Sequence, residues 1–247
     1  MAAKNFLTWG HHAVLAALAD APGSAIEIWL REGNLSTELA QIRTTSEAIG
    51  VNAQVVPTKT LARLSDGAVH QGVILRRKMP ELLDFDSYLA QAAVNPIAPL
   101  LLVLDQIQDP QNFGACLRVA DGAGIDAVLI PRDHSAPISG TVAKAASGAL
   151  DNVPIIAVAN LARALERLRE AGIWIIGAAH DGPTTFYSCD MTLPSAIILG
   201  SEAQGLRQLT RKKCDHLASI PMRGGVASLN VSTATAIALF EAQRQRM

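Results

Sequence analysis

The chain has 247 residues, of which 49% are hydrophobic and 4% aromatic, and its formal net charge is −1 at pH 7. This length is enough for one large domain or two ordinary ones, and the near-neutral charge gives no whole-chain signature of nucleic-acid binding. No apolar run approaches the roughly 20 residues of a bilayer-spanning helix, and no convincing signal-peptide cleavage site follows the N-terminus. The sequence therefore predicts a cytoplasmic protein with no membrane partner.

The three cysteines indicate the redox state. Cys116, Cys189 and Cys214 are odd in number and widely spaced, and no CxxC pair occurs. This pattern argues against a disulfide framework and against a zinc site. We therefore expect reduced thiols and no bound metal, with Cys116 as a small packing residue.

Alternating strands and helices begin at residue 26 and form a small α/β unit. The predicted segments are strands at 26–30, 51–57 and 72–78 and helices at 36–50 and 58–65. Prolines near both ends of residues 79–97 predict a linker with one short helix. The sequence therefore divides into residues 1–78, the linker 79–97 and residues 98–247.

The alternation is stronger in the C-terminal part. Strands are predicted at 99–105, 125–131, 153–159, 173–179 and 195–200, and helices at 112–124, 139–150, 160–172 and 228–247. Strands that are apolar throughout indicate an α/β fold with a mostly parallel sheet covered on both faces. Ligands of such sheets bind at the carboxyl ends of the strands, so we expect the chemistry in the loops there.

The first of these loops contains polar residues that packing does not explain. Asp109 and Pro110 predict a turn, and Asn112 stands where a helix cap is expected. Gly114 permits close backbone approach, and Arg118 extends from the first turns of the helix. An ordinary capped helix with an exposed arginine is the alternative reading.

Two further strand-end loops repeat this pattern. Gly200 directly follows an apolar strand, and Glu202 lies at a predicted helix start, where it would also favour the helix dipole. The third loop leads into the terminal helix, whose opening holds the polar residues Ser228, Asn230, Ser232, Thr233 and Thr235. One polar residue suffices to cap a helix, so the surplus indicates a ligand or, alternatively, a subunit interface.

Several common sites are missing from the sequence. No GxGxxG follows the first strand of the sheet, and no GxxxxGKS, GxxxxGKT or GxSxG motif is present. A dinucleotide-dependent dehydrogenase or a P-loop enzyme would therefore lack its phosphate-binding loop. Two basic clusters, at 76–78 and 207–213, are compatible with nucleic acid, although such clusters are more often solvated surface.

Three motifs in chain order resemble one known family. The segments NFGACLR at 112–118, GSEAQGL at 200–206 and IPMRGGVASLNVSTATAIALFE at 220–241 are similar to the successive motifs of the SpoU branch of the SPOUT methyltransferases. The upstream segments GHHAVLAAL and SDGAVHQGVI extend the resemblance over essentially the whole chain, to members that methylate a guanosine of bacterial 23S rRNA. The resemblance implies transfer of a methyl group from S-adenosylmethionine to a ribose 2′-hydroxyl.

The resemblance also implies a fold and an assembly. The family's catalytic domain is an α/β domain with a deep trefoil knot, an exception to the rule that chains avoid knots. A small ribosomal-protein-like RNA-binding domain precedes it, corresponding here to residues 1–78. Because the family works as homodimers through the knotted region, we expect a homodimer that binds 23S rRNA or a pre-50S particle, and no DNA.

The resemblance places S-adenosylmethionine in the knot, held largely by backbone groups around Gly200, Ile220, Met222 and Leu229. Glycine-containing loops suit such recognition, because they leave amides free and permit close approach. No metal is required, since the leaving group is a neutral thioether.

The resemblance assigns catalysis to Asn112, Arg118, Glu202, Ser228 and Asn230. In the family, the arginine of the first motif has been proposed to accept the 2′-hydroxyl proton. A guanidinium holds its proton far above neutral pH. The residues alone therefore favour an electrostatic role, in which Arg118 orients the hydroxyl while the proton leaves through phosphate or water.

The N-terminal unit is expected to contact RNA through His11, His12 and the basic cluster at 76–78. Two alternatives stay open: an enzyme of the same family that acts on tRNA, and a non-catalytic RNA-binding or ribosome-assembly protein. The intact motif residues argue against the second, because a pure binder has no reason to keep all three loops.

Overall fold

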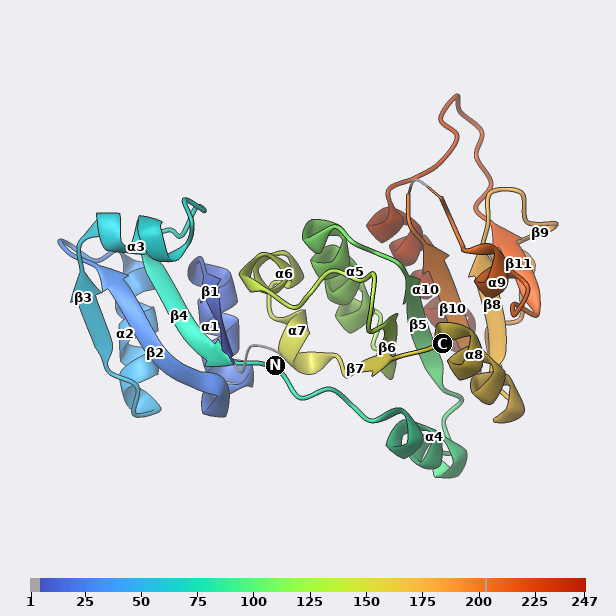
Figure 1. Cartoon of the computed structure of the whole chain (residues 1–247), viewed down its shortest axis with the longest axis horizontal. Coiled ribbons are helices and arrows are strands. Elements are labelled where there is room, and N and C mark those ends of the chain that lie inside the picture. The colour runs from blue at the N-terminus through green and yellow to red at the C-terminus, as the bar shows by residue number, and fades with distance from the viewer. Residues whose placement is uncertain (1–4, 203) are drawn as a thin grey trace. The chain divides into compact units, whose positions relative to one another are not determined.

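The computed structural model describes residues 5–202 and 204–247 and divides into two compact units (Figure 1). The N-terminal unit runs up to Pro80 and also contains Pro137–Asn152, and the C-terminal unit comprises Glu81–Ala136 and Val153–Met247. The domain boundaries predicted at residues 78 and 97 stay a prediction. The division by contacts differs from them in assigning Pro137–Asn152 to the N-terminal unit.

The N-terminal unit is built on a four-stranded mixed sheet in the order β1-β4-β2-β3. Strand β4 is antiparallel to both β1 and β2, whereas β2 and β3 are parallel. Its elements are β1 (Asn5–Trp9), α1 (His11–Asp20), β2 (Ala25–Arg31), α2 (Thr37–Ala48), β3 (Ala53–Val56), α3 (Thr58–Leu64), β4 (Val73–Lys78), α6 (Gly140–Ala146) and α7 (Ala149–Asn152). The elements predicted from the sequence begin only at residue 26, so β1 and α1 are additions that the structure reveals.

Local signals explain two of the helix ends in this unit. Ser36 caps α2 as expected, because its Oγ accepts a hydrogen bond from the amide of Leu39 at 3.4 Å. The single helix predicted over 139–150 is wrong: Ser147 has φ 53°, a left-handed conformation that ends α6, and α7 starts two residues later.

A buried ion pair joins the two sequence segments of this unit. Arg77 forms two hydrogen bonds with Asp151, and their side chains are only 2% and 4% exposed. The expectation that the whole cluster at 76–78 contacts RNA is therefore wrong for Arg77, which no solvent-borne ligand reaches. Arg76 is partly exposed and pairs with Glu27 at 3.0 Å.

The C-terminal unit contains a seven-stranded sheet in the order β7-β6-β5-β10-β8-β11-β9. Every neighbouring pair is parallel, which confirms the mostly parallel sheet. Its elements are α4 (Phe85–Val94), β5 (Leu100–Asp105), α5 (Pro110–Gly122), β6 (Ala127–Pro131), β7 (Ile155–Val158), α8 (Leu161–Glu170), β8 (Trp174–Ala178), β9 (Thr184–Thr185), β10 (Ser195–Gly200), α9 (Gln208–Arg211), β11 (His216–Ser219) and α10 (Val231–Arg246). The short helix predicted within the linker is α4.

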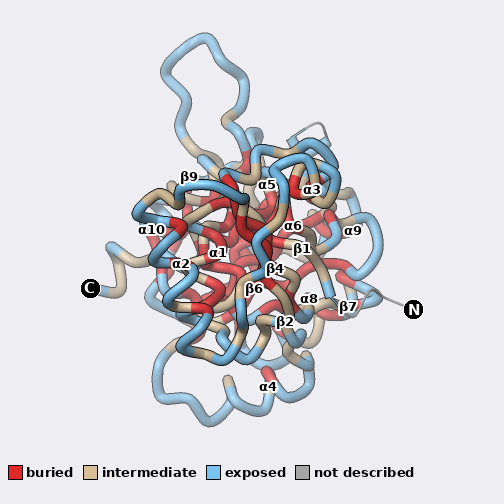
Figure 2. The backbone as a smooth tube through the Cα atoms, turned by 90° about the vertical axis from the view of Figure 1, so that its left-hand side faces the viewer, coloured by how far each residue is buried: buried red, intermediate tan, exposed pale blue. Residues whose placement is uncertain are grey.

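The central strands are apolar because helices cover both faces of the sheet. All six residues of β5 are buried, and Figure 2 marks the buried stretches of the backbone in red and the exposed ones in pale blue. On one face, Leu101 and Val103 belong to a core cluster that includes Leu165 of α8 and Tyr88 of α4. Helices α5 and α10 pack against each other, and α10 also contacts β10. No helix of the described residues is long and apolar enough to cross a membrane.

Candidate functional site

The carboxyl ends of β5 and β10 bring the three predicted loops together. Asn112 Nδ2 donates a hydrogen bond to Glu202 Oε1 at 3.0 Å, and Asn230 Nδ2 lies 2.9 Å from Asn112 Oδ1 and 2.6 Å from Glu202 Oε1. These residues are 28 to 118 positions apart in the chain. One side chain from each motif therefore contributes to a single hydrogen-bonded ring, called the polar ring below.

The N-caps of α5 and α10 determine which side chains can join the polar ring. Asp109, rather than Asn112, is the N-cap of α5, and its carboxylate accepts from the amide of Gln111 at 2.9 Å. The cap assignment for Asn112 is therefore wrong: it lies inside the first turn, so its amide is free to meet Glu202. Asn230 caps α10 and accepts from the amide of Ser232 at 2.9 Å.

Glu202 has one saturated and one available oxygen. Its Oε1 accepts from Asn112, from Asn230 and from the amide of Val231 at 3.2 Å. Its Oε2 accepts no hydrogen bond from the described residues. Three donors fix the orientation of the carboxylate, and the second oxygen remains able to accept a hydrogen bond from a ligand.

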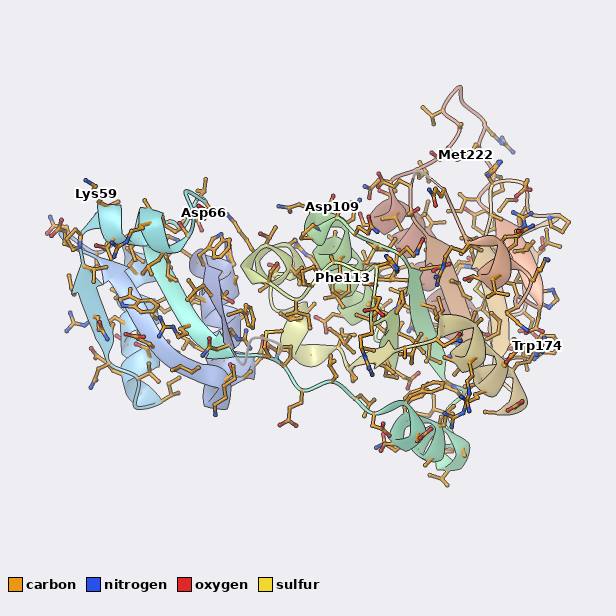
Figure 3. All side chains as sticks on the ribbon, in the orientation of Figure 1. Lys59, Asp66, Asp109, Phe113, Trp174 and Met222 are labelled. Carbon is orange, nitrogen blue, oxygen red and sulfur yellow. The ribbon has the colours of Figure 1, made fainter. Side chains whose placement is uncertain are left out.

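A cavity of about 400 Å³ lies beside the polar ring, at the carboxyl ends of β8, β10 and β11. Its wall contains all four residues predicted to hold the cofactor, together with the predicted catalytic residue Ser228: Gly200, Ile220, Met222, Leu229 and Ser228. Met222 lies on the loop between β11 and α10, labelled in Figure 3. The structure therefore gathers the second and third motifs around one hollow.

Sequence reasoning missed other residues of this wall. Ala178 ends β8 and His180 follows it, Phe186 lies after β9, and Arg211 belongs to α9. The apolar strand at 173–179 was predicted, but its position beside β10 was not, because periodicity does not give the strand order. Arg211 is held by a bidentate pair with Asp181 at 2.8 Å, which lowers the pKa of Asp181.

Gly200 is required by a close backbone approach. A Cβ at this position would lie 2.1 Å from the carbonyl carbon of Gly205, which itself has φ 65°. The loop thus folds back on the end of β10, and Ser201 and Gly205 form an isolated antiparallel bridge. Any side chain at residue 200 would force this loop away from the cavity wall.

The structure does not bring Arg118 into the same group. Arg118 is exposed on α5 and lines neither the 400 Å³ cavity nor a smaller one beside it. On the same helix, Cys116 is fully buried, with its Sγ 3.4 Å from Oγ1 of Thr235 on α10. Burial raises the pKa of Cys116 to about 11, so this thiol is a packing residue, as expected.

The basic cluster at 207–213 is largely neutralised within the protein. Arg207 pairs with the buried Asp105 at 2.7 Å, and Lys213 pairs with Glu166. With Arg211 also paired, the cluster offers little free charge to nucleic acid. Among the described residues, no group of three or more His, Cys, Asp and Glu side chains is placed to hold a metal ion.

Two family models match the chain. The model of the SpoU rRNA Methylase family matches residues 99–240, and the model described as RNA 2′-O ribose methyltransferase substrate binding matches residues 7–83.

Relatives match nearly the whole length. The 23S rRNA (guanosine-2′-O-)-methyltransferase RlmB of Vibrio parahaemolyticus is 46% identical over 247 residues, covering 99% of this chain and 98% of the relative. RlmB of Escherichia coli is 45% identical over 240 residues, covering 97% and 98%. The crystal structure of the SpoU methyltransferase AviRb from Streptomyces viridochromogenes, in complex with AdoMet, superposes with a TM-score of 0.79 at 23% identity and covers 98% of this chain and 91% of that chain. The motifs, the parallel sheet and these matches agree, and the chain belongs to the SpoU rRNA methylase family.

Proposed function

We propose that this protein transfers a methyl group from S-adenosylmethionine to the 2′-hydroxyl of a guanosine in 23S rRNA. The observation that carries the proposal is the polar ring of Asn112, Glu202 and Asn230, whose Glu202 lines the 400 Å³ cavity. The RlmB relatives, which are 45–46% identical over nearly all of both chains, are 23S rRNA (guanosine-2′-O-)-methyltransferases, and this supports the same substrate.

The larger cavity fits S-adenosylmethionine in size and in chemistry. At about 400 Å³ it lies within the roughly 300–1,000 Å³ range of small-molecule sites. Leu199, Met222 and Leu229 supply apolar surface for a purine and a thioether chain, and the tight loop at Gly200 exposes backbone groups. When bound, this cosubstrate supplies an electrophilic methyl group.

The polar ring orients the ribose. Asn112 and Asn230 hold the Glu202 carboxylate through its Oε1, which directs Oε2 toward an incoming hydroxyl. A positioned carboxylate that accepts the hydroxyl hydrogen bond raises the nucleophilicity of the oxygen and aligns it for displacement. Ser228, in the wall of the larger cavity, adds a further hydroxyl at the same boundary.

Arg118 acts electrostatically. It is exposed and outside both cavities, and a guanidinium stays protonated at neutral pH. Its role is to bind an RNA phosphate near the target ribose, rather than to accept the proton.

The finer features of the family belong to the same proposal. Residues 1–78 form a ribosomal-protein-like RNA-binding domain, residues 79–97 a linker and residues 98–247 a catalytic domain with a trefoil knot through which two copies dimerise. The protein acts in the cytoplasm on 23S rRNA or a pre-50S particle. Family membership and the match of residues 7–83 to a substrate-binding model support these assignments.

The deciding experiment is transfer of labelled methyl from S-adenosylmethionine to 23S rRNA transcribed without modifications, followed by mapping of the labelled nucleotide. A single 2′-O-methylguanosine supports the proposal. Label on tRNA instead identifies the other branch of the family, and cofactor binding without transfer to rRNA, tRNA or pre-50S particles supports a non-catalytic protein. Light scattering of the same preparation tests the dimer.

A further inference from the structure

A second, smaller cavity adjoins the polar ring. It has a volume of about 290 Å³ and shares Ser201, Glu202 and Gln204 with the larger cavity. Its own wall comes from the loop between β5 and α5, through Gln106 and Gln108. The two cavities therefore meet at Glu202, the residue whose free oxygen is placed to accept a hydroxyl.

The two cavities differ in chemistry. Many residues of the larger wall are apolar, whereas most of the smaller wall consists of amides, carboxylates and a hydroxyl. No lysine, arginine or histidine is among the described residues that line the smaller cavity. A wall with carboxylates and no cation disfavours phosphate and favours groups that donate N–H or O–H hydrogen bonds. The smaller cavity therefore suits a nucleoside rather than the RNA backbone.

The loop that forms this wall is held rigidly. Gln106 has φ 63°, a left-handed conformation that costs a non-glycine residue about 1 kcal/mol or more. Its neighbours on both sides are anchored: Asp105 is buried and accepts from Arg207, and the carbonyl of the buried Ile107 accepts from the amide of Ala136 at 2.8 Å. Fixed neighbours keep Gln106 at the cavity, which is the preorganisation that a recognition site needs.

We propose that the smaller cavity receives the base of the target guanosine, with Gln106 and Gln108 as the side chains that recognise it. This inference rests on the proposed function. Guanine presents two neighbouring N–H donor groups on its Watson–Crick edge, an imino and an amino group, and single-stranded RNA bases are read on that edge. The amide oxygens of the two glutamines match these donors, and the ribose then lies at Glu202, where the cavities meet.

The test is a double variant, Gln106→Gly with Gln108→Ala. Glycine adopts φ 63° without strain, so the first change deletes the amide and keeps the loop. The matched control is Gln111→Ala. Gln111 is an exposed glutamine at the start of α5, directly after this loop, and it lines neither cavity. Each protein is assayed for kcat/KM on an RNA fragment that carries guanosine at the mapped position and on the same fragment with inosine, which lacks the amino group.

We expect the double variant to lose about 10- to 100-fold in kcat/KM on the guanosine RNA, as fits two lost hydrogen bonds. The wild type and the control should prefer guanosine to inosine by about tenfold, and the double variant should not discriminate. Affinity for S-adenosylmethionine should stay unchanged in all three proteins, and neither variant should melt at a lower temperature than the wild type.

Two results would overturn the inference, and they are distinguishable. If the double variant keeps the wild-type preference for guanosine over inosine, Gln106 and Gln108 do not read the base while the proposed function stands. If the wild type methylates neither RNA, the proposed function fails and the inference fails with it.

Discussion

The two ends of α10 carry polar clusters of opposite character. At the C-terminal end, Arg246 donates to the carbonyl oxygens of Met191, Ala98 and Leu193 at 2.6–2.8 Å and to that of Pro99 at 3.3 Å. At the N-terminal end, the polar ring leaves Oε2 of Glu202 without a partner among the described residues. One end of the helix is thus held by hydrogen bonds within the protein, and the other end lies beside a carboxylate oxygen that can still bind a substrate.

The buried pair of Arg77 and Asp151 offers the strongest test of polar groups that serve the structure alone. Arg77→Met leaves the Asp151 carboxylate, 4% exposed, without its partner, and should cost about 3–5 kcal/mol of unfolding free energy. Urea unfolding measures this, with Arg76→Met as control, because Arg76 is 40% exposed and its pair with Glu27 should contribute less than about 1 kcal/mol. Equal losses of unfolding free energy in the two variants would contradict the distinction between the buried and the exposed ion pair.

Glu202→Gln tests the polar group that remains available to a substrate. The amide side chain is similar in size but has no charge, so kcat for methyl transfer should fall about 10²- to 10³-fold while the melting temperature changes little. Single-turnover transfer of labelled methyl measures the effect, and Glu170→Gln, at the exposed end of α8, is the control. A large drop in stability with unchanged kcat would mean that the polar ring is structural.

Arg246→Ala tests the anchor of α10. The change removes four donated hydrogen bonds to carbonyl groups that are partly buried, and we expect a loss of about 2–3 kcal/mol of unfolding free energy. Arg43→Ala is the control: the side chains of Arg43 and its partner Glu47 are 53% and 47% exposed, so less than about 1 kcal/mol is expected. If both variants unfold at the same urea concentration, Arg246 does not anchor α10.

The smallest expected effect is a pH dependence from Glu241. Hydrogen bonds from Arg244 and Gln245 lower the pKa of Glu241 from 4.5 to about 2. Because the folded-state pKa is lowered, the stabilisation is fully present above about pH 4.5 and is lost as the pH falls toward 2. Unfolding curves of wild type and Glu241→Gln should differ at pH 7 and converge near pH 2; a constant difference would refute this.

The sequence predicted the parts of the site that are local. Apolar runs located the central strands, and the surplus polar residues at the start of α10 pointed to the loop of Ser228 and Asn230. The strand-end loops and then the family motifs both pointed to Asn112 and Glu202, whose hydrogen bonds across 28 to 118 residues no periodicity reveals.

The misses have physical causes. The partner of Arg77 lies 74 residues away, so a buried ion pair looked like a basic surface cluster. The cap of α5 was assigned to Asn112, although Asp109 also suits that position, and only the backbone decides between them. His180 reaches the larger cavity because β8 lies beside β10 in the sheet, and Phe186 follows β9, which pairs with β11; a linear pattern does not encode this strand order.

The contact between Cys116 and Thr235 gives this protein a built-in chemical reporter. Thiolates, not thiols, react with alkylating reagents, and burial raises the pKa of Cys116 to about 11. Cys116 is fully buried on α5 and its Sγ lies 3.4 Å from Thr235 Oγ1 on α10, so a reagent reaches it only when the two helices separate. The rate of Cys116 labelling therefore measures local opening of α10, the helix whose first residues complete the polar ring.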